Sequence, residues 1–390
     1  MKVPMSSPDL GEAERQAVAE VLHTPRLSMG PQVEAFEAAV AKYVGARYAI
    51  AVSSGTAALH LCVRAAGVQD GDLVITTPFS FVASANVLLY ERAVPVFVDV
   101  DPTTGNLDPG QVSEAAHAIQ GSTGSEWLPR RGADPRGELR AILAVDVFGQ
   151  PADYDRLLGT AEKHQLALIE DASEALGAQY HEKSAGTLGD AAAFAFYPNK
   201  QLTTGEGGMV VTEREDWAER VLALRNQGRA QNDRWLQHTY PGYNYRLDEM
   251  SAALGRAQAE RLDELLAKRD RVAGWYKQQL QALPGIELAQ LALTTTRMSW
   301  FVYIIRLDSH IDRAKLMAEL EGKGIPSRAY FEPIHLQPYM LERFGFRTGD
   351  FPVAEDLGRR SLALPFSGVM TQEQVSYVSD GLRAALGVVG

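Results

Sequence analysis

One lysine, Lys200, lies in the stretch FYPNKQLTTGEGGMVVT (residues 196–212), between a proline-containing turn and a glycine-rich bend that leads into an apolar, β-branched run. A loop lysine is ordinarily a solvated charge. A lysine held among other polar groups can instead act as a reactive amine that forms a Schiff base with an aldehyde. Both interpretations stay open for Lys200 alone, so the choice depends on the groups that accompany it.

A second stretch, SSGTAALHL, places Ser53, Ser54, Gly55 and Thr56 directly before a predicted helix. Free amides at a helix N-terminus, a glycine that permits close approach and hydroxyl groups together suit a phosphate. An ordinary Ser/Thr N-cap is the alternative for this motif taken alone.

Acidic and aromatic residues follow two other apolar segments. Asp171, in ALIEDASEALG, would need a cationic partner if it were partly buried, and a protonated pyridine nitrogen would serve. A structural cap is the alternative for this residue. In TTPFSFVASAN, Phe79 and Phe81 could place an aromatic face over a planar heterocycle, or could pack in the core.

These four features have complementary roles if Lys200 forms a Schiff base with an aldehyde cofactor. The roles are a covalent attachment point, a phosphate cradle, a partner for a ring nitrogen and a stacking face. The combination predicts pyridoxal 5'-phosphate (PLP) as the cofactor.

The elements that must position these residues alternate along the chain. Short apolar segments are typical of strands at residues 48–54, 72–78, 94–101, 141–149, 166–172, 191–198 and 207–212. Runs with apolar residues at three- and four-residue spacing, such as 56–67, 152–165 and 214–228, indicate helices between several of them. The alternation predicts an α/β fold, a mainly parallel sheet with helices on both faces. Ligands of such sheets bind beyond the carboxyl ends of the strands, where the four features lie.

The pattern changes near Leu247. A long amphipathic helical region follows (249–283), which we expect to be kinked at a glycine, then a strand within 299–308, a helix over 313–323 and a closing helix after Thr371. This predicts a large domain over residues 1–246, with an N-terminal arm, and a smaller α+β domain over 247–390. Residues 121–140 are rich in Gly, Pro and Arg without a period, which indicates a mobile insertion, either a lid or a disordered segment.

Composition limits the partners. The 390 residues carry a formal charge of -11, which argues against nucleic acid or an anionic membrane surface as the main partner and favours a small molecule. Cys62 is the single cysteine, so no intrachain disulfide can form, and it reads as a small core residue. No N-terminal apolar block and no run of about 18 apolar residues is present, so we expect a cytoplasmic protein.

Six motifs occur in an order that resembles the DegT/DnrJ/EryC1/StrS aminotransferases, the sugar aminotransferase group of fold-type I PLP enzymes. They are SSGTAALHL, TTPFSFVASAN, EDASEALGA, FYPNKQLTTGEGGMVVT, GYNYRLDEMSAALG and PIHLQPYM. The resemblance covers nearly the whole chain. It implies a large PLP-binding domain built as three layers around a seven-stranded sheet, a smaller C-terminal domain and a homodimer with active sites at the subunit interface.

The resemblance also implies roles for single residues. Lys200 would carry the cofactor as a Schiff base, and Asp171 would pair with the pyridine nitrogen. Glu174 would face the cofactor's 3-hydroxyl, where many members have Gln or His. The other implied contacts are ring stacking by Phe81, phosphate binding by Gly55 and Thr56, phosphate binding by Asn244 from the neighbouring subunit, and a substrate-phosphate contact by His335.

Two departures from the family pattern stand out. Ala195 occupies the position five residues before the lysine, where many relatives have a phosphate-binding serine, so another donor such as Ser53 or a water must compensate. The segment 121–140 is longer than the family leads us to expect.

The expected activity is amino transfer from glutamate to a nucleotide-linked keto sugar, more narrowly a 4-keto-6-deoxy sugar. The Glu174 variant of the DASEALG motif resembles the perosamine synthase branch. Amination of a 3-keto sugar, a sugar dehydratase of the same fold and a non-catalytic regulator are the alternatives. Dehydratases of this fold carry His at the lysine position, and a regulator has no use for the electron-sink arrangement, so Lys200 and Asp171 favour the transferase.

Overall fold

The computed structural model describes residues 1, 3–132 and 137–387. Its centre is a seven-stranded sheet in the order β1-β9-β8-β5-β4-β2-β3. Only β9 runs antiparallel to its two neighbours in this sheet. The strands are β1 (Tyr48–Val52), β2 (Leu73–Thr76), β3 (Val94–Phe97), β4 (Leu139–Val145), β5 (Ala167–Asp171), β8 (Ala191–Ala195) and β9 (Gly208–Thr212). The expected α/β fold with a mainly parallel sheet is confirmed.

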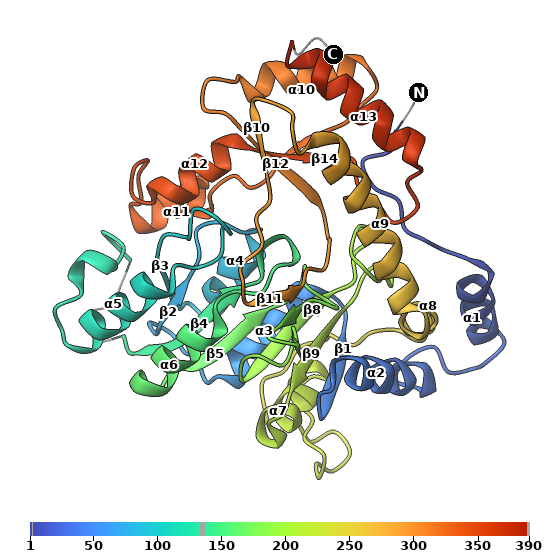
Figure 1. Ribbon diagram of the computed structural model, residues 1–390. Helices are drawn as coiled ribbons and strands as arrows, with labels where there is room; N and C mark the ends of the chain where they lie inside the picture. The colour runs from blue at the N-terminus through green and yellow to red at the C-terminus, as the bar shows by residue number, and fades with distance from the viewer. Residues whose placement is uncertain (2, 133–136, 388–390) are drawn as a thin grey trace.

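Helices cover both faces of this sheet and make a three-layer arrangement (Figure 1). One face carries α3 (Gly55–Ala65), α4 (Ala83–Tyr90) and α7 (Glu215–Arg225). The opposite face carries α2 (Pro31–Val44), α5 (Pro109–Gln120) and α6 (Tyr154–His164). Because both faces are covered, the strands are short apolar runs rather than alternating sequences. In β2, for example, Val74 and Ile75 point into opposite layers of the core.

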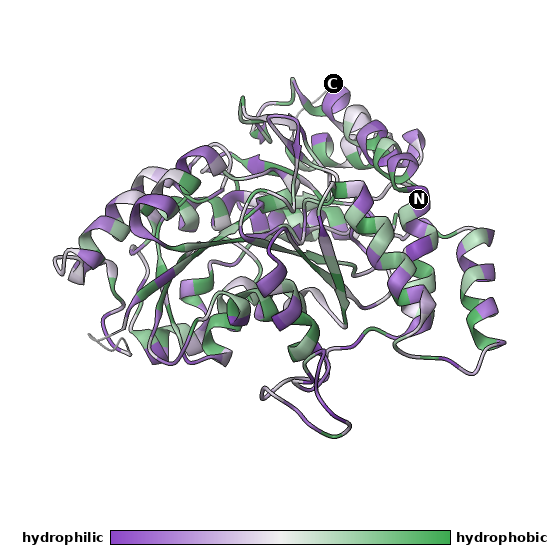
Figure 2. Cartoon of the chain, turned by 90° about the horizontal axis from the view of Figure 1, so that it is seen from below, coloured by the Kyte–Doolittle hydropathy of each residue, from purple (hydrophilic) through white to green (hydrophobic). Residues whose placement is uncertain are grey.

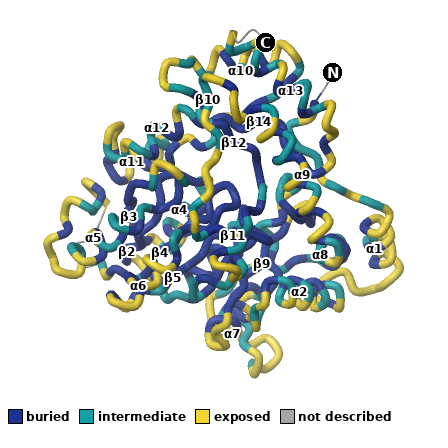
Figure 3. Tube along the Cα trace, viewed as in Figure 1, coloured by how far each residue is buried: buried dark blue, intermediate teal, exposed yellow. Residues whose placement is uncertain are grey.

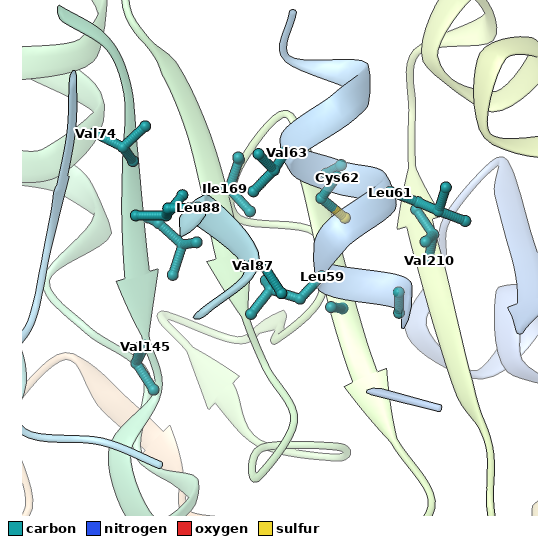
Figure 4. Packing of buried hydrophobic residues seen from close by; sticks show 14 of the residues in the cluster. Leu59, Leu61, Cys62, Val63, Val74, Val87, Leu88, Val145, Ile169 and Val210 are labelled. Carbon is teal, nitrogen blue, oxygen red and sulfur yellow. The ribbon is translucent and has the colours of Figure 1, made fainter. Parts of the chain in front are cut away.

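Burial and hydropathy follow this layering. The strands of the central sheet are buried, whereas α1 (Glu12–Leu22) and the loop after α5 are largely exposed (Figure 3). Apolar residues dominate the strands and hydrophilic residues are frequent on the outer helices (Figure 2). Cys62 lies inside the layer between α3 and the sheet, beside Val63, Val87 and Ile169 (Figure 4). The expected core position of Cys62 is confirmed by its complete burial.

The C-terminal part contains a second sheet, with four antiparallel strands in the order β10-β12-β14-β13. Its strands are β10 (Ile286–Leu288), β12 (Tyr303–Leu307), β13 (Arg328–Ala329) and β14 (Ser361–Leu364). Its helices are α9 (Leu262–Leu280), α10 (Arg313–Gly322), α11 (Pro338–Phe344), α12 (Pro352–Arg360) and α13 (Gln372–Ala385). The strand expected within 299–308, the helix over 313–323 and the closing helix correspond to β12, α10 and α13.

The long helical region is interrupted, but not at a glycine as expected. It divides into α8 (Glu249–Glu260) and α9 at Arg261, and its two glycines, Gly255 and Gly274, lie inside the helices. The guanidinium of Arg261 donates to Glu14 (2.6 Å) and to the Asp9 carbonyl (2.7 Å) of the N-terminal segment. These contacts hold the break through residues far away in the sequence. Helix α8 lies after the expected boundary but packs against α1 and α2, which lie before it. The domain boundary near Leu247 therefore stays a prediction.

Short elements complete the described chain. A three-stranded sheet combines β6 (Gln179–Tyr180), β7 (Lys183–Ser184) and β11 (Thr295–Arg297) in the order β11-β6-β7, and 3-10 turns occur at η1 (Ser125–Trp127), η2 (Val147–Gly149) and η3 (Ile334–Leu336). Within the described ranges, every helix is too short or too polar to cross a membrane.

The expected insertion at 121–140 is described only in part. Its end, from Leu139, already belongs to β4. Arg130 donates to the carboxylate of Asp350 through both terminal nitrogens (2.5 and 2.7 Å), and the amide of Arg131 donates to the Phe344 carbonyl (3.2 Å). This part of the segment is therefore packed against α11 and the loop that follows it. The mobility expected for residues 133–136 lies outside the described residues.

Candidate active site

A pocket of about 620 Å³ lies at the C-terminal ends of the parallel strands. The turn after β1 supplies one side, the ends of β4, β5 and β8 supply the floor, and the C-terminal part of the chain supplies aromatic residues. This is where an open α/β sheet binds its ligands, because the loops that follow parallel strands meet at that edge. The pocket has the size of a typical small-molecule site. Among its lining residues are Ser54, Gly55, Thr56, Phe81, Asp171, Glu174, Ala195, Lys200, Phe301 and Tyr330.

Lys200 points its amine into this pocket. Nζ lies 3.6 Å from Oε1 of Glu174 and 3.8 Å from the centroid of the Phe301 ring. Burial lowers the pKa of the Lys200 amine, while the nearby carboxylates of Glu174 and Asp171 oppose that shift. Lys200 is therefore a largely buried pocket residue and not a solvated loop charge.

Arg269 of α9 holds the backbone on which Lys200 stands. Its guanidinium donates to the carbonyl oxygens of Asn199 (3.0 Å) and Lys200 (2.6 Å), and also to those of Trp300 (3.1 Å) and Phe301 (3.2 Å). A single buried cation thereby joins the lysine loop to the loop that carries Phe301. Burial lowers the pKa of Arg269 to about 10, so it stays charged at neutral pH.

Asp171 ends β5 and is almost fully buried. Its Oδ2 accepts from the Ser84 hydroxyl (2.8 Å) and its Oδ1 accepts from the Ser173 amide (3.2 Å). A carboxylate can accept up to about four hydrogen bonds, so a donor in the pocket can still be accommodated. Asp171 is thus fixed in orientation and suited to a cationic ring N–H.

Glu174 stands between the amine and the turn after β4. Its Oε2 accepts from the amide of Phe148 (2.9 Å), which orients Oε1 toward Lys200. Burial raises the pKa of Glu174, and the positive charge of Lys200 opposes that rise. The two groups therefore stabilise each other's charge in a site that penalises both.

The Ser53–Thr56 turn leads into helix α3, and the N-terminal end of this helix lines the pocket. The Ser54 hydroxyl accepts from the amide of Ala57 (3.0 Å), so the N-cap interpretation is confirmed, and the turn lines the pocket as well. The first amides of a helix have no acceptor within the helix, which leaves those of Gly55 and Thr56 for a ligand. A Cβ on Gly55 would lie 2.4 Å from the Cβ of Ala195, so the glycine and the alanine pack together there. Ser54, rather than the suggested Ser53, is the serine of this turn that faces the pocket.

The two phenylalanines considered from the sequence have different surroundings. Phe81 lines the pocket and is 61% exposed, which leaves its ring available to a ligand. Phe79 is completely buried, and its ring packs against Phe148 and Phe331 with centroids 5.9 and 5.7 Å away. Core packing is therefore the role of Phe79.

Asn244 and His335 are not brought to this pocket. Asn244 is exposed, and its backbone forms an isolated bridge with Asn226. His335 is fully buried, with Nε2 3.0 Å from a carboxylate oxygen of Glu355 and its ring centroid 4.7 Å from that of Phe351. A side chain enclosed in this way has no surface with which to contact a substrate. The expected contact between His335 and a substrate phosphate stays a prediction, which this buried position does not support.

Sequence reasoning missed several lining residues, namely Tyr197, Asn199, Glu206, Phe301, Tyr330 and Phe331. Tyr197, Asn199 and Glu206 flank Lys200 closely enough to be suspected from position alone. Phe301 and Tyr330 lie in segments that read as ordinary apolar sequence, with no local signal for their place beside Lys200.

The three binding groups that PLP requires are therefore present on three sides of one pocket. The Lys200 amine suits the aldehyde, the buried Asp171 carboxylate suits a protonated ring nitrogen, and the amides of Gly55 and Thr56 suit the phosphate. A side chain on Gly55 would collide with Ala195, so the glycine lets the turn lie directly against the end of β8. The residues present fit the cofactor.

Comparisons with known proteins agree with this site. The model of the DegT/DnrJ/EryC1/StrS aminotransferase family matches residues 8–383. The GDP-perosamine synthase of Caulobacter vibrioides is 38% identical over 391 residues, covering 99% of this chain and 98% of that protein. A Bacillus subtilis protein named putative pyridoxal phosphate-dependent aminotransferase EpsN is 34% identical over 383 residues, covering 98% and 95%. Among solved structures, S. venezuelae DesV in complex with a ketimine intermediate has a TM-score of 0.87 and 34% identity over 100% of both chains.

Family, fold and pocket lead to one conclusion. The match extends over nearly the whole chain, and the structure groups the lysine, the acid and the helix N-terminus that the motifs indicated. The chain belongs to the DegT/DnrJ/EryC1/StrS aminotransferase family, and it is a PLP-dependent aminotransferase.

Proposed function

We propose that this protein transfers the amino group of L-glutamate to the keto group of a nucleotide-linked sugar, and more narrowly to a 4-keto-6-deoxyhexose. The observation that carries the proposal is the buried Lys200 amine, 3.6 Å from Glu174 in a pocket shared with Asp171. The relative named GDP-perosamine synthase supports a nucleotide-sugar acceptor.

PLP, when bound, supplies an electron sink for the carbon that loses a proton. Asp171 holds the ring nitrogen in its cationic form by opposite-charge stabilisation, and Ser84 and Ser173 keep the carboxylate oriented for that task. Glu174 faces the 3-hydroxyl of the ring. Gly55 and Thr56 hold the phosphate end.

Lys200 is the covalent attachment point and, once the amino donor has displaced its amine from the cofactor, the group that moves the proton. Burial lowers the pKa of its amine, which increases the neutral fraction able to accept a proton at Nζ. After Nζ has accepted the proton, the carboxylate of Glu174 stabilises the ammonium until the proton is returned to the adjacent carbon of the cofactor or substrate. One side chain thus serves as base and acid in turn.

The remaining assignments complete the proposed site. Phe81, exposed at the mouth of the pocket, stacks on the ring. Asn244, exposed on the surface, contacts the phosphate held by a second subunit, which requires a homodimer. No substrate contact is proposed for His335.

A panel of nucleotide keto sugars tests this function. The purified protein is incubated with PLP, glutamate carrying heavy nitrogen and 4-keto or 3-keto sugars linked to different nucleotides, and the products are read by mass. We expect labelled nitrogen in a 4-keto-6-deoxy sugar product, and none with Lys200→Ala. The matched control is Lys163→Ala, which removes an exposed lysine of α6 and should leave turnover unchanged.

Each other outcome selects an alternative. Labelled product only from 3-keto sugars would show that the protein aminates the 3 position of the sugar ring instead of the 4 position. A new ketone without nitrogen would indicate a dehydratase. Cofactor binding without a product from any sugar would contradict the proposed transfer and favour a regulator.

A further inference from the structure

A half-buried polar cluster lies beside helix α3, outside the pocket. We call it the His60 cluster, and it consists of His60, Arg64, Glu91, Tyr243 and Tyr245. His60 Nε2 lies 2.8 Å from Oε1 of Glu91, and His60 Nδ1 lies 3.1 Å from the Tyr245 hydroxyl. The Tyr243 hydroxyl donates to the same Glu91 oxygen (3.0 Å), and Arg64 pairs with the other oxygen.

Glu91 is the centre of this cluster, because three of the other members bond to its carboxylate. Burial opposes its charge, but the bonds from His60, Arg64 and Tyr243 hold the pKa of Glu91 below its usual value. With Glu91 ionised, neutral His60 donates from Nε2 and accepts the Tyr245 O–H at Nδ1. The cluster is therefore fully connected, with a defined donor and acceptor at each contact.

The rings of the two tyrosines are stacked, with centroids 4.9 Å apart and planes at 9°. Their backbone is fixed too. At the end of α7, the amide of Tyr243 donates to the Leu224 carbonyl (2.7 Å), and the carbonyl of Tyr243 accepts from the Gln227 amide (2.7 Å). The segment 243–245 thus has two independent attachments. One is the backbone of residues 224–227 and the other is the His60 cluster.

This segment is joined to the turn that opens the pocket. The carbonyl oxygen of Tyr245 accepts from the amide of Ser53 (2.9 Å), and Ser53 directly precedes the pocket residues Ser54, Gly55 and Thr56. His60 lies one helical turn after Thr56 on the same helix, α3. The cluster is therefore connected to the turn in two ways. One is the backbone hydrogen bond between Ser53 and Tyr245, and the other is helix α3, which carries both Thr56 and His60.

The opposite side of the turn rests on β8 and β9. A Cβ on Gly208 would lie 2.4 Å from the Ser54 carbonyl oxygen, and one on Gly55 would lie 2.4 Å from the Ala195 Cβ. The turn is thus packed between these strand ends and the Tyr245 carbonyl. A displacement of residues 243–245 would loosen the side of the turn that the strands do not support.

Helix α4 gives the cluster a second connection to the pocket. Glu91 caps the C-terminal end of α4, and Ser84, near the N-terminal end of the same helix, donates to Asp171. Helices α3 and α4 pack against each other (Figure 1). The cluster therefore links α3 and α4. The N-terminal end of α3 belongs to the phosphate turn, and the N-terminal end of α4 carries Ser84, which bonds to Asp171.

We propose that the His60 cluster positions the Ser53–Thr56 turn, and that it thereby determines how tightly the protein holds the phosphate end of PLP. The inference rests on the proposed role of that turn. The cluster residues do not line the pocket, so they are positioning residues rather than catalytic ones.

The test compares two ligands that differ only in the phosphate. Apoprotein is titrated with PLP and with pyridoxal, and the Kd of each is obtained from the visible absorbance of the bound form. Glu91→Gln leaves the shape of the central side chain but removes its charge, and we expect its Kd for PLP to rise on the order of tenfold. We expect its Kd for pyridoxal to stay within about twofold of the wild-type value.

Two milder variants serve as test and control. Tyr245→Phe removes only the hydroxyl that contacts His60, and should shift the Kd for PLP in the same direction by a smaller factor. Tyr90→Phe is the matched control: its ring meets His60 edge-on at 5.3 Å, but within the described residues its hydroxyl bonds to no member of the cluster. Tyr90→Phe should leave both Kd values unchanged. If Glu91→Gln fails to fold, Tyr245→Phe decides.

The outcomes separate this inference from the proposed function. If the wild-type protein binds neither ligand, the proposed cofactor site fails. If it binds both with equal Kd, the turn is not a phosphate site. A wild-type preference for PLP that is unaltered in the cluster variants, or equal weakening of both ligands in them, would overturn the inference alone.

Discussion

The amine of Lys200 lies 3.6 Å from a carboxylate oxygen of Glu174, and both side chains are nearly enclosed, with 12% and 9% of their surfaces exposed. Burial disfavours the charged form of each group, while each charge stabilises the other. The protonation state of the amine thus depends on the carboxylate beside it. Removing that carboxylate is the direct way to measure the dependence.

Glu174→Gln should lower the pKa of Lys200 further. The variant keeps the size of the side chain but removes the charge that favours the ammonium, so the neutral amine should persist to lower pH. The measurement is the rate of acetylation of Lys200 in the apoprotein as a function of pH, followed by peptide mass. We expect the midpoint of the profile to move to lower pH. The exposed Lys163 in the same sample should keep its midpoint, and an unchanged or raised midpoint for Lys200 would contradict the stabilisation of its ammonium by Glu174.

Gly55→Ala should destabilise the protein by roughly 1–3 kcal/mol, because the added Cβ would lie 2.4 Å from that of Ala195. Gly159→Ala is the matched control. Gly159 lies inside α6, and a Cβ added there would meet no atom within 4 Å, so alanine should stabilise the helix by up to about 1 kcal/mol. Urea denaturation of the apoproteins measures both changes. Equal effects at the two positions would mean that the turn can move away from β8.

A buried carboxyl pair below the pocket should make stability depend on pH. Asp146 is fully buried, and its Oδ1 accepts from the Ala152 amide (3.0 Å) and the Tyr154 hydroxyl (2.9 Å). Burial and the neighbouring charge of Glu170 raise the pKa of Asp146 well above its usual value. Burial raises the pKa of Glu170 to about 7, against the opposing hydrogen bonds from backbone amides.

Because both pKa values are raised by folding, the folded state binds more protons than the unfolded state. For Glu170 the resulting stabilisation is complete at low pH and is lost as pH rises from about 4.5 to about 7, and for Asp146 the loss begins at about 3.8. Asp146→Asn removes one of the two titrating groups and keeps an oxygen that can accept from the Ala152 amide and the Tyr154 hydroxyl. Its free energy of unfolding should therefore fall less steeply than that of the wild type across this range. Urea denaturation at several pH values measures the slope.

Glu162→Gln, at an exposed position of α6, is the control and should retain the wild-type slope. Asp146→Ala should cost about 1–3 kcal/mol at low pH, since the Ala152 amide and the Tyr154 hydroxyl lose their acceptor, and the cost should shrink as pH rises. A steeper fall for Asp146→Asn than for the wild type would contradict the raised pKa values.

Much of the central sheet could be predicted from the sequence. Each expected strand segment overlaps a strand of the sheet, although β4 begins two residues before the expected segment, because strands buried on both faces are apolar runs bounded by turn residues. Lys200, Asp171 and Gly55 could be grouped for a topological reason, since loops after parallel strands share one edge. That grouping is what made a cofactor predictable from residues that lie far apart in the sequence.

Features set by contacts between distant segments could not be predicted. The helix break at Arg261 depends on Glu14 and Asp9, which no local pattern connects to it. Phe301 reaches the Lys200 amine from a strand-like apolar segment, and Arg269 bonds to the lysine loop from the middle of a helix. His335 sits in a family-like motif, yet its side chain is enclosed by Phe346, Phe351 and Glu355. Sequence identity at that position indicates the motif, but not the direction of the side chain.

The attachment of PLP to Lys200 can be measured directly by reducing the protein–cofactor mixture with borohydride, digesting it and locating the label by peptide mass. We expect the phosphopyridoxyl group on the peptide that contains Lys200, no label and no turnover with Lys200→Ala, and full labelling with Lys163→Ala. Label on a different lysine of the wild-type protein, or unchanged turnover of Lys200→Ala, would contradict the central claim.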